Sequence, residues 1–223
     1  MTVFEEELQR LNEKILTMGC LVEEAIKNSI HALMDRNDLL AWNVIDKEHL
    51  IDAFDVEIDE ACIRLIALRQ PKAVDLRFIT TAMKVTSELE RMGDLAVNIA
   101  ERATELNDEP ELQPYIDIPK MSDIARNMTR DVLDAFVRRD AQLAAEVIAR
   151  DDEIDAYKVQ IIRELSLLMA LDSSRADRAL RVSFVAYYLE RIADHATNIA
   201  EMLIYLVKGT IVKHANLTPE NQE

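Results

Sequence analysis

The chain has 223 residues, a net charge of −16 and an isoelectric point near 4.7. With Gly 3, Pro 5, 49% apolar and 5% aromatic residues, its composition argues against a turn-rich β-sandwich or barrel and against disorder. It is typical of long packed helices, and the lack of a Lys/Arg-rich segment argues against nucleic-acid binding.

The N-terminal segment, Met-Thr-Val-Phe-Glu-Glu-Glu, lacks the basic region followed by an apolar region that marks a signal peptide. No window reaches the about 18 uninterrupted apolar residues that a membrane-spanning helix needs. Cys20 and Cys62 lie in helical patterns, and we interpret them as buried reduced thiols rather than a disulfide or a metal-binding pair. We therefore expect a cytoplasmic protein that does not insert into the membrane.

The first half of the chain is dominated by helical periodicity. After a first helix, Arg36-Asn37-Asp38 is interpreted as a tight turn in which Asp38 is the N-cap. A second helix is expected from about residue 38 to 70, and a third from Pro71, which suits a first helical turn. Apolar residues spaced alternately by three and four predict a coiled-coil-like seam inside a bundle. They are Ile51, Phe54, Ile58, Ala61, Leu65 and Leu68, then Leu89, Met92, Ala96, Ile99, Ala103 and Leu106.

The second half begins after a clear linker, Asn107 to Lys120, which holds three of the five prolines. Arg139-Asp140 is interpreted as a short turn, and Asp172-Ser173-Ser174 offers N-caps for a last helix that Gly209 ends. We expect six long helices, three in each half, with neighbours antiparallel because the turns are short.

The two halves are copies of each other. The segment 90–101 matches 190–201 at 8 of 12 positions, and 51–58 matches 154–161 at 5 of 8. We therefore predict an all-α fold of two tandem three-helix bundles related by internal duplication. The expected boundaries are 1–108 for the first bundle, 109–120 for the linker, 121–212 for the second bundle and 213–223 for a loose tail.

Acidic stripes follow two helices of the first half. At about 100° per residue, the stripe on the third helix occupies a narrow arc roughly opposite the apolar seam, so we expect it to face outward. A parallel stripe follows the second helix. The residues are Glu48, Asp52, Asp55 and Asp59 on the second helix and Glu90, Asp94, Asn98 and Glu101 on the third.

The second half repeats the stripes less completely. Its candidates are Asp151, Asp155, Glu190, Asp194, Asn198 and Glu201, while Lys158 and Ile162 stand where the first half has Asp55 and Asp59. The plain alternative for both halves is a solvated helix face, with Arg91 pairing to Asp94 and Arg191 to Asp194.

A metal site is the sharper interpretation of the stripes. Carboxylates one turn apart repel each other unless a cation lies between them, and Asp and Asn are poor residues inside helices. Oxygen ligands on two adjacent helices suit Fe, Mn, Mg or Zn ions, and residue types alone do not choose among them.

Other functional motifs are missing from the sequence. It contains no Glu-x-x-His pair of the di-iron bundles, no Walker loop, no Gly-x-Ser-x-Gly and no Cys/His spacing typical of a metal site. His195 lies near the edge of the seam, and we interpret it as a packing residue or a support for a neighbouring ligand. Nothing indicates a nucleophile with its base, so we expect no catalytic activity.

Two copies of Glu-Arg-x-x-Asp-x-x-x-Asn-Ile-Ala-Glu, each on the last helix of its half, resemble the PhoU family of phosphate-transport regulators. Arg69-Gln70-Pro71 and Asp75-Leu76-Arg77 resemble that family's entry to the third helix. The resemblance covers roughly residues 5–210. It implies metal-binding pairs at Glu48/Asp52, Glu90/Asp94, Asp151/Asp155 and Glu190/Asp194, with Ala193 replacing the usual glycine found at Gly93.

The resemblance also implies a function. A PhoU-like protein is expected to be a homodimeric, cytoplasmic negative regulator of phosphate uptake and of the phosphate-starvation response. It would act as an adaptor between the ATPase subunit of the phosphate ABC transporter and a sensor histidine kinase. The alternative is a metal-binding or metal-buffering helical carboxylate protein, which includes a metal-dependent enzyme.

Overall fold

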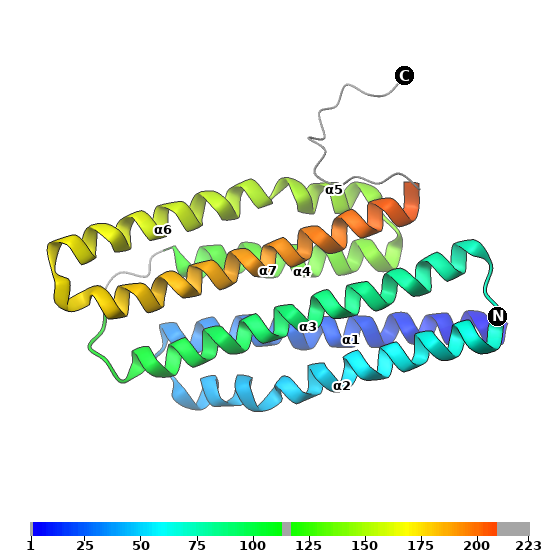
Figure 1. The fold of residues 1–223 in the computed structure, drawn as a ribbon, viewed down its shortest axis with the longest axis horizontal. Coiled ribbons are helices and arrows are strands. Elements are labelled where there is room, and N and C mark those ends of the chain that lie inside the picture. The colour runs from blue at the N-terminus through cyan, green and yellow to red at the C-terminus, as the bar shows by residue number, and fades with distance from the viewer. Residues whose placement is uncertain (1, 113–116, 209–223) are drawn as a thin grey trace, which may run out of the picture.

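The computed structural model describes residues 2–112 and 117–208, and these residues form an all-α fold whose helices all run along the long axis of the molecule (Figure 1). The all-α prediction is therefore confirmed. The elements are α1 (Val3–Met34), α2 (Asp38–Arg69), α3 (Ala73–Asn107), α4 (Ile118–Arg138), α5 (Ala141–Ala149), α6 (Asp151–Leu171), the short 3₁₀ helix η1 (Ser173–Arg175) and α7 (Ala176–Lys208).

The helices of the first half begin and end at residues with clear capping roles. At α1, Thr2 and Glu5 form a reciprocal capping box that satisfies two otherwise free backbone N–H groups. The cap of α2 is Asn37, whose side chain accepts from the backbone of Leu40, so the expectation that Asp38 is the cap was wrong. Gln70 adopts a left-handed conformation and ends α2, and α3 starts at Ala73, beyond the predicted Pro71.

The second half has one break that the sequence did not predict. Its second helix is divided into α5 and α6 at Arg150, so the described residues contain seven α-helices where six were expected. Arg150 is tied to α4 by an ion pair of 2.6 Å between its Nη1 and Oδ2 of Asp131. The turn before α5 is as expected, with Arg139 in a left-handed conformation and Asp140 capping the helix.

The two halves pack side by side. In the first half α3 contacts both other helices, and in the second half α7 contacts α4, α5 and α6. The halves meet where α3 lies against α7 and α1 against α4 (Figure 1). Buried residues from both halves form one continuous hydrophobic cluster. The duplicated units are thus joined through a shared core, in addition to the linker between α3 and α4.

Contacts between the halves are close. The rings of Phe78 on α3 and Phe136 on α4 stack with centroids 5.4 Å apart, and the guanidinium of Arg139 covers the Phe78 ring. A Cβ added to Gly19 on α1 would lie 2.2 Å from Cδ1 of Leu133 on α4, so only glycine allows this approach.

Some boundary predictions differ from the structure or lie outside it. Helix α4 begins at Ile118, inside the segment expected to be linker. Gly209 and the expected tail, 213–223, lie outside the described residues. Cys62 is buried as expected, but Cys20 is exposed because it lies on the side of α1 away from the core.

Candidate functional site

Carboxylates of α2 and α3 meet between the two helices in the first half of the chain. We call this group the first acidic cluster. Helices α2 and α3 are adjacent and antiparallel, so the acidic stripes on their facing sides lie next to each other. Its members are Glu48, Asp52, Asp55, Asp59, Glu90 and Asp94.

A glycine brings the two helices together at this point. A Cβ added to Gly93 on α3 would lie 2.9 Å from Cδ1 of Ile51 on α2. Ile51 directly precedes Asp52, and Gly93 directly precedes Asp94. Their close approach therefore determines the separation of the two acidic stripes. The matching residue in the second half is Ala193.

Repulsion between the carboxylates acts on Glu48. Burial, the charge of Asp94 and a side-chain hydrogen bond to Asp94 together raise the pKa of Glu48 above its ordinary value. Two carboxyl groups share a hydrogen bond only when one of them holds a proton. A cation that lies between them holds them equally close. The Glu48–Asp94 contact therefore indicates a position where positive charge is needed.

Burial and neighbouring carboxylates also raise the pKa of other members of the cluster. Burial raises the pKa of Glu90, and the charges of Asp94 and Asp55 add to it. Burial and the charge of Asp59 raise the pKa of Asp55. Among the described residues, no Lys, Arg or His forms an ion pair with any member of the first acidic cluster. The nearest compensation is the charge of Arg91, which acts on Glu90 without an ion pair.

The cluster is less exposed than its sequence pattern suggested. Asp52 is exposed, but Glu48, Asp55, Glu90 and Asp94 are half-buried between the helices. The expectation of an outward-facing stripe was therefore only partly right, because the facing helix covers one side of each stripe. Partial burial strengthens the repulsion, since it removes water that would otherwise screen the charges.

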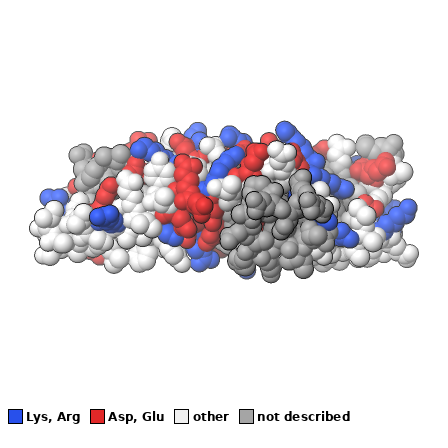
Figure 2. Space-filling view, turned by 90° about the horizontal axis from the view of Figure 1, so that it is seen from above, with Lys and Arg blue, Asp and Glu red and all other residues white. Residues whose placement is uncertain are grey.

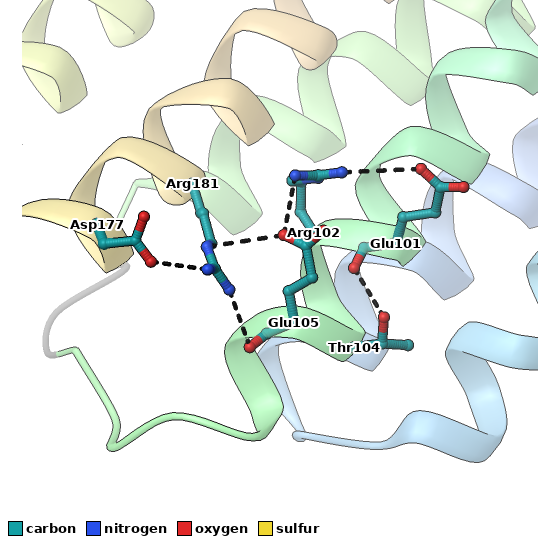
Figure 3. Close-up of polar contacts among 6 residues, drawn as sticks. All are labelled: Glu101, Arg102, Thr104, Glu105, Asp177 and Arg181. Atoms are coloured by element: carbon teal, nitrogen blue, oxygen red, sulfur yellow. Dashed lines mark hydrogen bonds and ion pairs between the residues drawn. The ribbon is translucent and has the colours of Figure 1, made fainter.

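Two of the eight predicted first-half residues lie at the edge of this group, although the charge of Glu101 adds to the effects of burial and Asp94 that raise the pKa of Glu48. Glu101 is exposed and lies 3.9 Å from the guanidinium of its neighbour Arg102 (Figure 3). Arg102 is paired more closely with Glu105, which also contacts Arg181 of α7. This network belongs to the junction between the halves. Asn98 is half-buried, and none of the hydrogen bonds within the described residues links it to the cluster.

The second acidic cluster, between α6 and α7, contains a built-in cation. Nζ of Lys158 lies 2.7 Å from Oε1 of Glu190 and 2.9 Å from Oδ1 of Asp155. Although burial lowers it, the hydrogen bonds to Glu190 and Asp155 raise the pKa of Lys158 above its usual range. The members of this cluster are Asp151, Asp155, Glu190 and Asp194, together with Lys158.

The lysine does not neutralise the whole cluster. Burial and the charges of Asp194 and Asp155 raise the pKa of Asp151 to about 6. Burial and the charge of Glu190 also raise the pKa of Asp194, against the lowering effect of its neighbours. Oε2 of Glu190 is buried and has no hydrogen-bond partner among the described residues. The acids on the side of Asp151 therefore remain short of positive charge.

Asn198 and Glu201 lie apart from this second cluster. The amide of Asn198 donates to Oε2 of Glu88 on α3, at 3.1 Å, which places it at the junction of the halves rather than among the acids. Nδ1 of buried His195 lies 2.7 Å from the same oxygen. The expectation that His195 packs near the seam is thus correct, and its partner Glu88 was missed. Glu201 is half-buried, and no described ion pair includes it.

As the side chains stand, the described residues contain no group of three or more His, Cys, Asp or Glu arranged to hold a metal ion. The carboxyl groups of Glu48 and Asp94 lie within hydrogen-bond reach of each other. In the first acidic cluster, Asp52 and Glu90 lie near enough to act on these groups electrostatically and are the further oxygen donors available. A metal there would need these side chains to rotate toward one another.

The charge distribution is visible on the surface. Figure 2 shows acidic side chains gathered in a band across the middle of the face seen from the α5–α6 side, with basic side chains scattered around it. Within the part of the chain that the structure describes, no helix has the length and apolar character needed to cross a membrane.

The chain is similar to known proteins over almost its whole length. The family model described as "PhoU domain" matches twice, at residues 15–103 and 118–203, which confirms the internal duplication. A phosphate-specific transport system accessory protein PhoU homolog from Aquifex aeolicus is 45% identical, with 97% of this chain and 98% of the relative covered.

Solved structures agree with this match. The crystal structure of PhoU from Pseudomonas aeruginosa has a TM-score of 0.89 and 39% identity, covering 93% of this chain and 100% of the other. The crystal structure of the phosphate transport system regulatory protein PhoU from Streptococcus pneumoniae has a TM-score of 0.88 and 32% identity. The match covers 94% of this chain and 99% of the other.

Proposed function

The chain belongs to the PhoU family, and from this premise we propose that it acts in phosphate transport as a cytoplasmic negative regulator of phosphate uptake and of the phosphate-starvation response. In this role it links the ATPase subunit of the phosphate ABC transporter to a sensor histidine kinase. The single observation that carries the proposal is the near full-length match to a phosphate-specific transport system accessory protein homolog.

The proposed mode of action is binding rather than catalysis. The relatives are described as accessory or regulatory proteins of a transport system, which supports this choice. With a net charge of −16 and a band of acidic side chains on one face, the chain suits partners with basic surface patches (Figure 2). A homodimer is part of the same proposal, following the family resemblance.

We further propose that the first acidic cluster holds one or more Fe, Mn, Mg or Zn ions. The support is the hydrogen-bonded contact of Glu48 with Asp94 and the absence of an ion-pair partner for this cluster among the described residues. In the second cluster, the ammonium group of Lys158 already occupies the position between Asp155 and Glu190. A metal there would be confined to the side of Asp151 and Asp194.

This cluster also favours a second candidate function, a metal-binding or metal-buffering carboxylate protein. The two functions differ in what the cluster is for. Under the regulatory function, the metal stabilises a surface that partners recognise. Under the buffering function, cellular metal content changes when the cluster is removed, and phosphate control does not.

The test is a clean deletion in a strain without a paralogue, carrying a phosphate-starvation reporter and grown in rich phosphate. We expect the reporter to be active in the deletion strain and repressed again by the wild-type gene. The same reporter compares a Glu48→Gln/Asp94→Asn variant with Asp46→Asn, which changes an exposed acid on α2. Normal repression in the deletion strain would contradict the regulatory function.

A further inference from the structure

A groove rich in arginine lies at the opposite end of α2 from its N-cap. It is formed by the start of α1 and the end of α2, near the N-terminus in Figure 1, and encloses about 360 Å³. Four of its lining residues are basic (Arg10, Lys14, Arg64 and Arg69) and three are acidic (Glu7, Glu57 and Glu60). In a chain of net charge −16, a surplus of positive charge in a groove is unexpected.

Two of the basic residues are already paired. Arg69 makes a two-pronged contact with Glu7, with Nε and Nη2 at 2.7 and 2.9 Å from the two carboxylate oxygens. Nζ of Lys14 lies 2.6 Å from Oε2 of Glu57. These pairs hold α1 against the end of α2 and form the walls of the groove.

The other two basic residues are free. Arg10 and Arg64 form no hydrogen bond or ion pair with any residue that the structure describes. Both lie near the Glu7 carboxylate, since a hydrogen bond from Arg69 and then the charges of Arg69, Arg10 and Arg64 lower the pKa of Glu7. One carboxylate is thus surrounded by three guanidinium groups, two of which have unused donors.

The groove also has an apolar part. Leu11 and Leu65 are buried at its base, while Leu68 lines it with 68% of its surface exposed. Its volume is within the range of about 300–1,000 Å³ of small-molecule sites, which combine an apolar lining with a few polar groups. The groove therefore offers guanidinium donors beside an apolar surface.

The second half does not repeat two of the charged residues of this groove. The residues that correspond to Glu57 and Arg64 are Gln160 and Leu167. The Gln160 amide donates to buried Asp117, at 2.7 Å. The three-helix fold therefore forms without the arginine groups, so the fold alone does not account for them.

We propose that this groove binds a small organic phosphate, a phosphate monoester whose phosphate group is held by Arg10 and Arg64 and whose organic part lies against Leu11, Leu65 and Leu68. A guanidinium binds phosphate oxygens through two parallel N–H donors. A phosphate monoester has three terminal oxygens and about two negative charges, enough for two guanidinium groups. A carboxylate has two oxygens and one charge, which one arginine satisfies.

The test is calorimetric titration of the full chain with AMP, glucose 6-phosphate and phenyl phosphate, and with inorganic phosphate and adenosine. We expect at least one ester to bind, more tightly than inorganic phosphate, and adenosine not to bind. Its affinity should fall about a hundredfold in Arg10→Gln/Arg64→Gln, because two charge-assisted contacts are lost and each is worth about tenfold. Raising the salt concentration should also weaken it.

The matched control is Arg163→Gln, which removes an exposed arginine of α6 that has no ion pair among the described residues. It should bind the ester as the wild type does. Melting temperatures of both variants should equal the wild-type value, which shows that lost binding is not lost folding. The proposal is overturned if no ester binds, if inorganic phosphate binds equally well, or if the double variant retains wild-type affinity.

Discussion

The first and second acidic clusters occupy matching places in a duplicated fold, but they differ in how their charge is balanced. In the first cluster, Asp55 adds a further carboxylate, and none of its members has an ion-pair partner among the described residues. In the second, Lys158 stands at the position of Asp55 and binds Asp155 and Glu190. One half therefore supplies its own cation, whereas the other leaves room for a cation from solution.

The largest expected effect comes from removing the internal cation. Lys158→Met should lower the free energy of unfolding by about 2–3 kcal/mol, because it leaves half-buried Glu190 beside other acids and without its ion-pair partner. The measurement is urea unfolding at neutral pH. Lys84→Met, which changes an exposed lysine of α3, is the control and should cost less than about 0.5 kcal/mol. Equal effects of the two substitutions would contradict a charge-balancing role for Lys158.

The reciprocal change should stabilise the first half. Asp55→Lys places an ammonium group near Glu90, whose pKa is raised by burial and by the charges of Asp94 and Asp55. We expect the metal-free protein to gain about 1 kcal/mol, measured by melting in the presence of a strong chelator. Asp55→Asn separates the loss of a negative charge from the gain of a positive one and should give a smaller increase. A decrease in stability for both variants would show that the first cluster is not limited by repulsion.

A pH-dependent effect is expected at Asp151, whose pKa in the folded chain is about 6, above the ordinary value of 3.8. Between these two values the folded state binds more protons than the unfolded state, so this residue makes stability fall as pH rises from about 4 to about 6. Asp151→Asn should remove that loss and be more stable than the wild type at pH 7, by on the order of 1 kcal/mol after allowing for solvent screening. The advantage should disappear near pH 4. An advantage that is the same at both pH values would contradict titration as its cause.

The smallest expected effect concerns the distance between α2 and α3. Gly93→Ala gains helix propensity of about 1 kcal/mol but requires the end of the Ile51 side chain to move. The two effects nearly cancel, so we expect a change in stability within about 0.5 kcal/mol in thermal unfolding. Gly93→Val adds bulk that Ile51 cannot accommodate and should be destabilising. If Gly93→Val is as stable as the wild type, the close approach at Gly93 does not position the clusters.

The fold was predictable because helical periodicity and duplication are properties of residue spacing. The spacing of Glu48, Asp52, Glu90 and Asp94 places them on facing stripes once α2 and α3 are neighbours, and the structure brings their charges together. The break at Arg150 was not predictable in this way, because no Pro or Gly marks it and the residue is instead tied to Asp131 on another helix.

Contacts between distant segments were also beyond the sequence pattern. The substitution of Lys158 for Asp55 is visible in the repeat, but spacing alone indicates only the loss of an acid. That its long side chain reaches Glu190 depends on the packing of α6 against α7. In the same way, Asn198 was assigned to an acidic stripe, whereas the junction of the halves places it against Glu88.

The difference between the clusters is tested most directly by calorimetric titration of Mn²⁺, then Mg²⁺, Zn²⁺ and Fe²⁺, into metal-free wild type, Asp55→Lys and Lys158→Asp. We expect the wild type to bind at least one of these ions, and to be stabilised by about 2.7 kcal/mol at a hundredfold excess over the dissociation constant. Asp55→Lys should lose this binding, and Lys158→Asp should gain a second site. Binding by Asp55→Lys at wild-type affinity, or no binding of any of the four ions by the wild type, would contradict an external cation in the first acidic cluster.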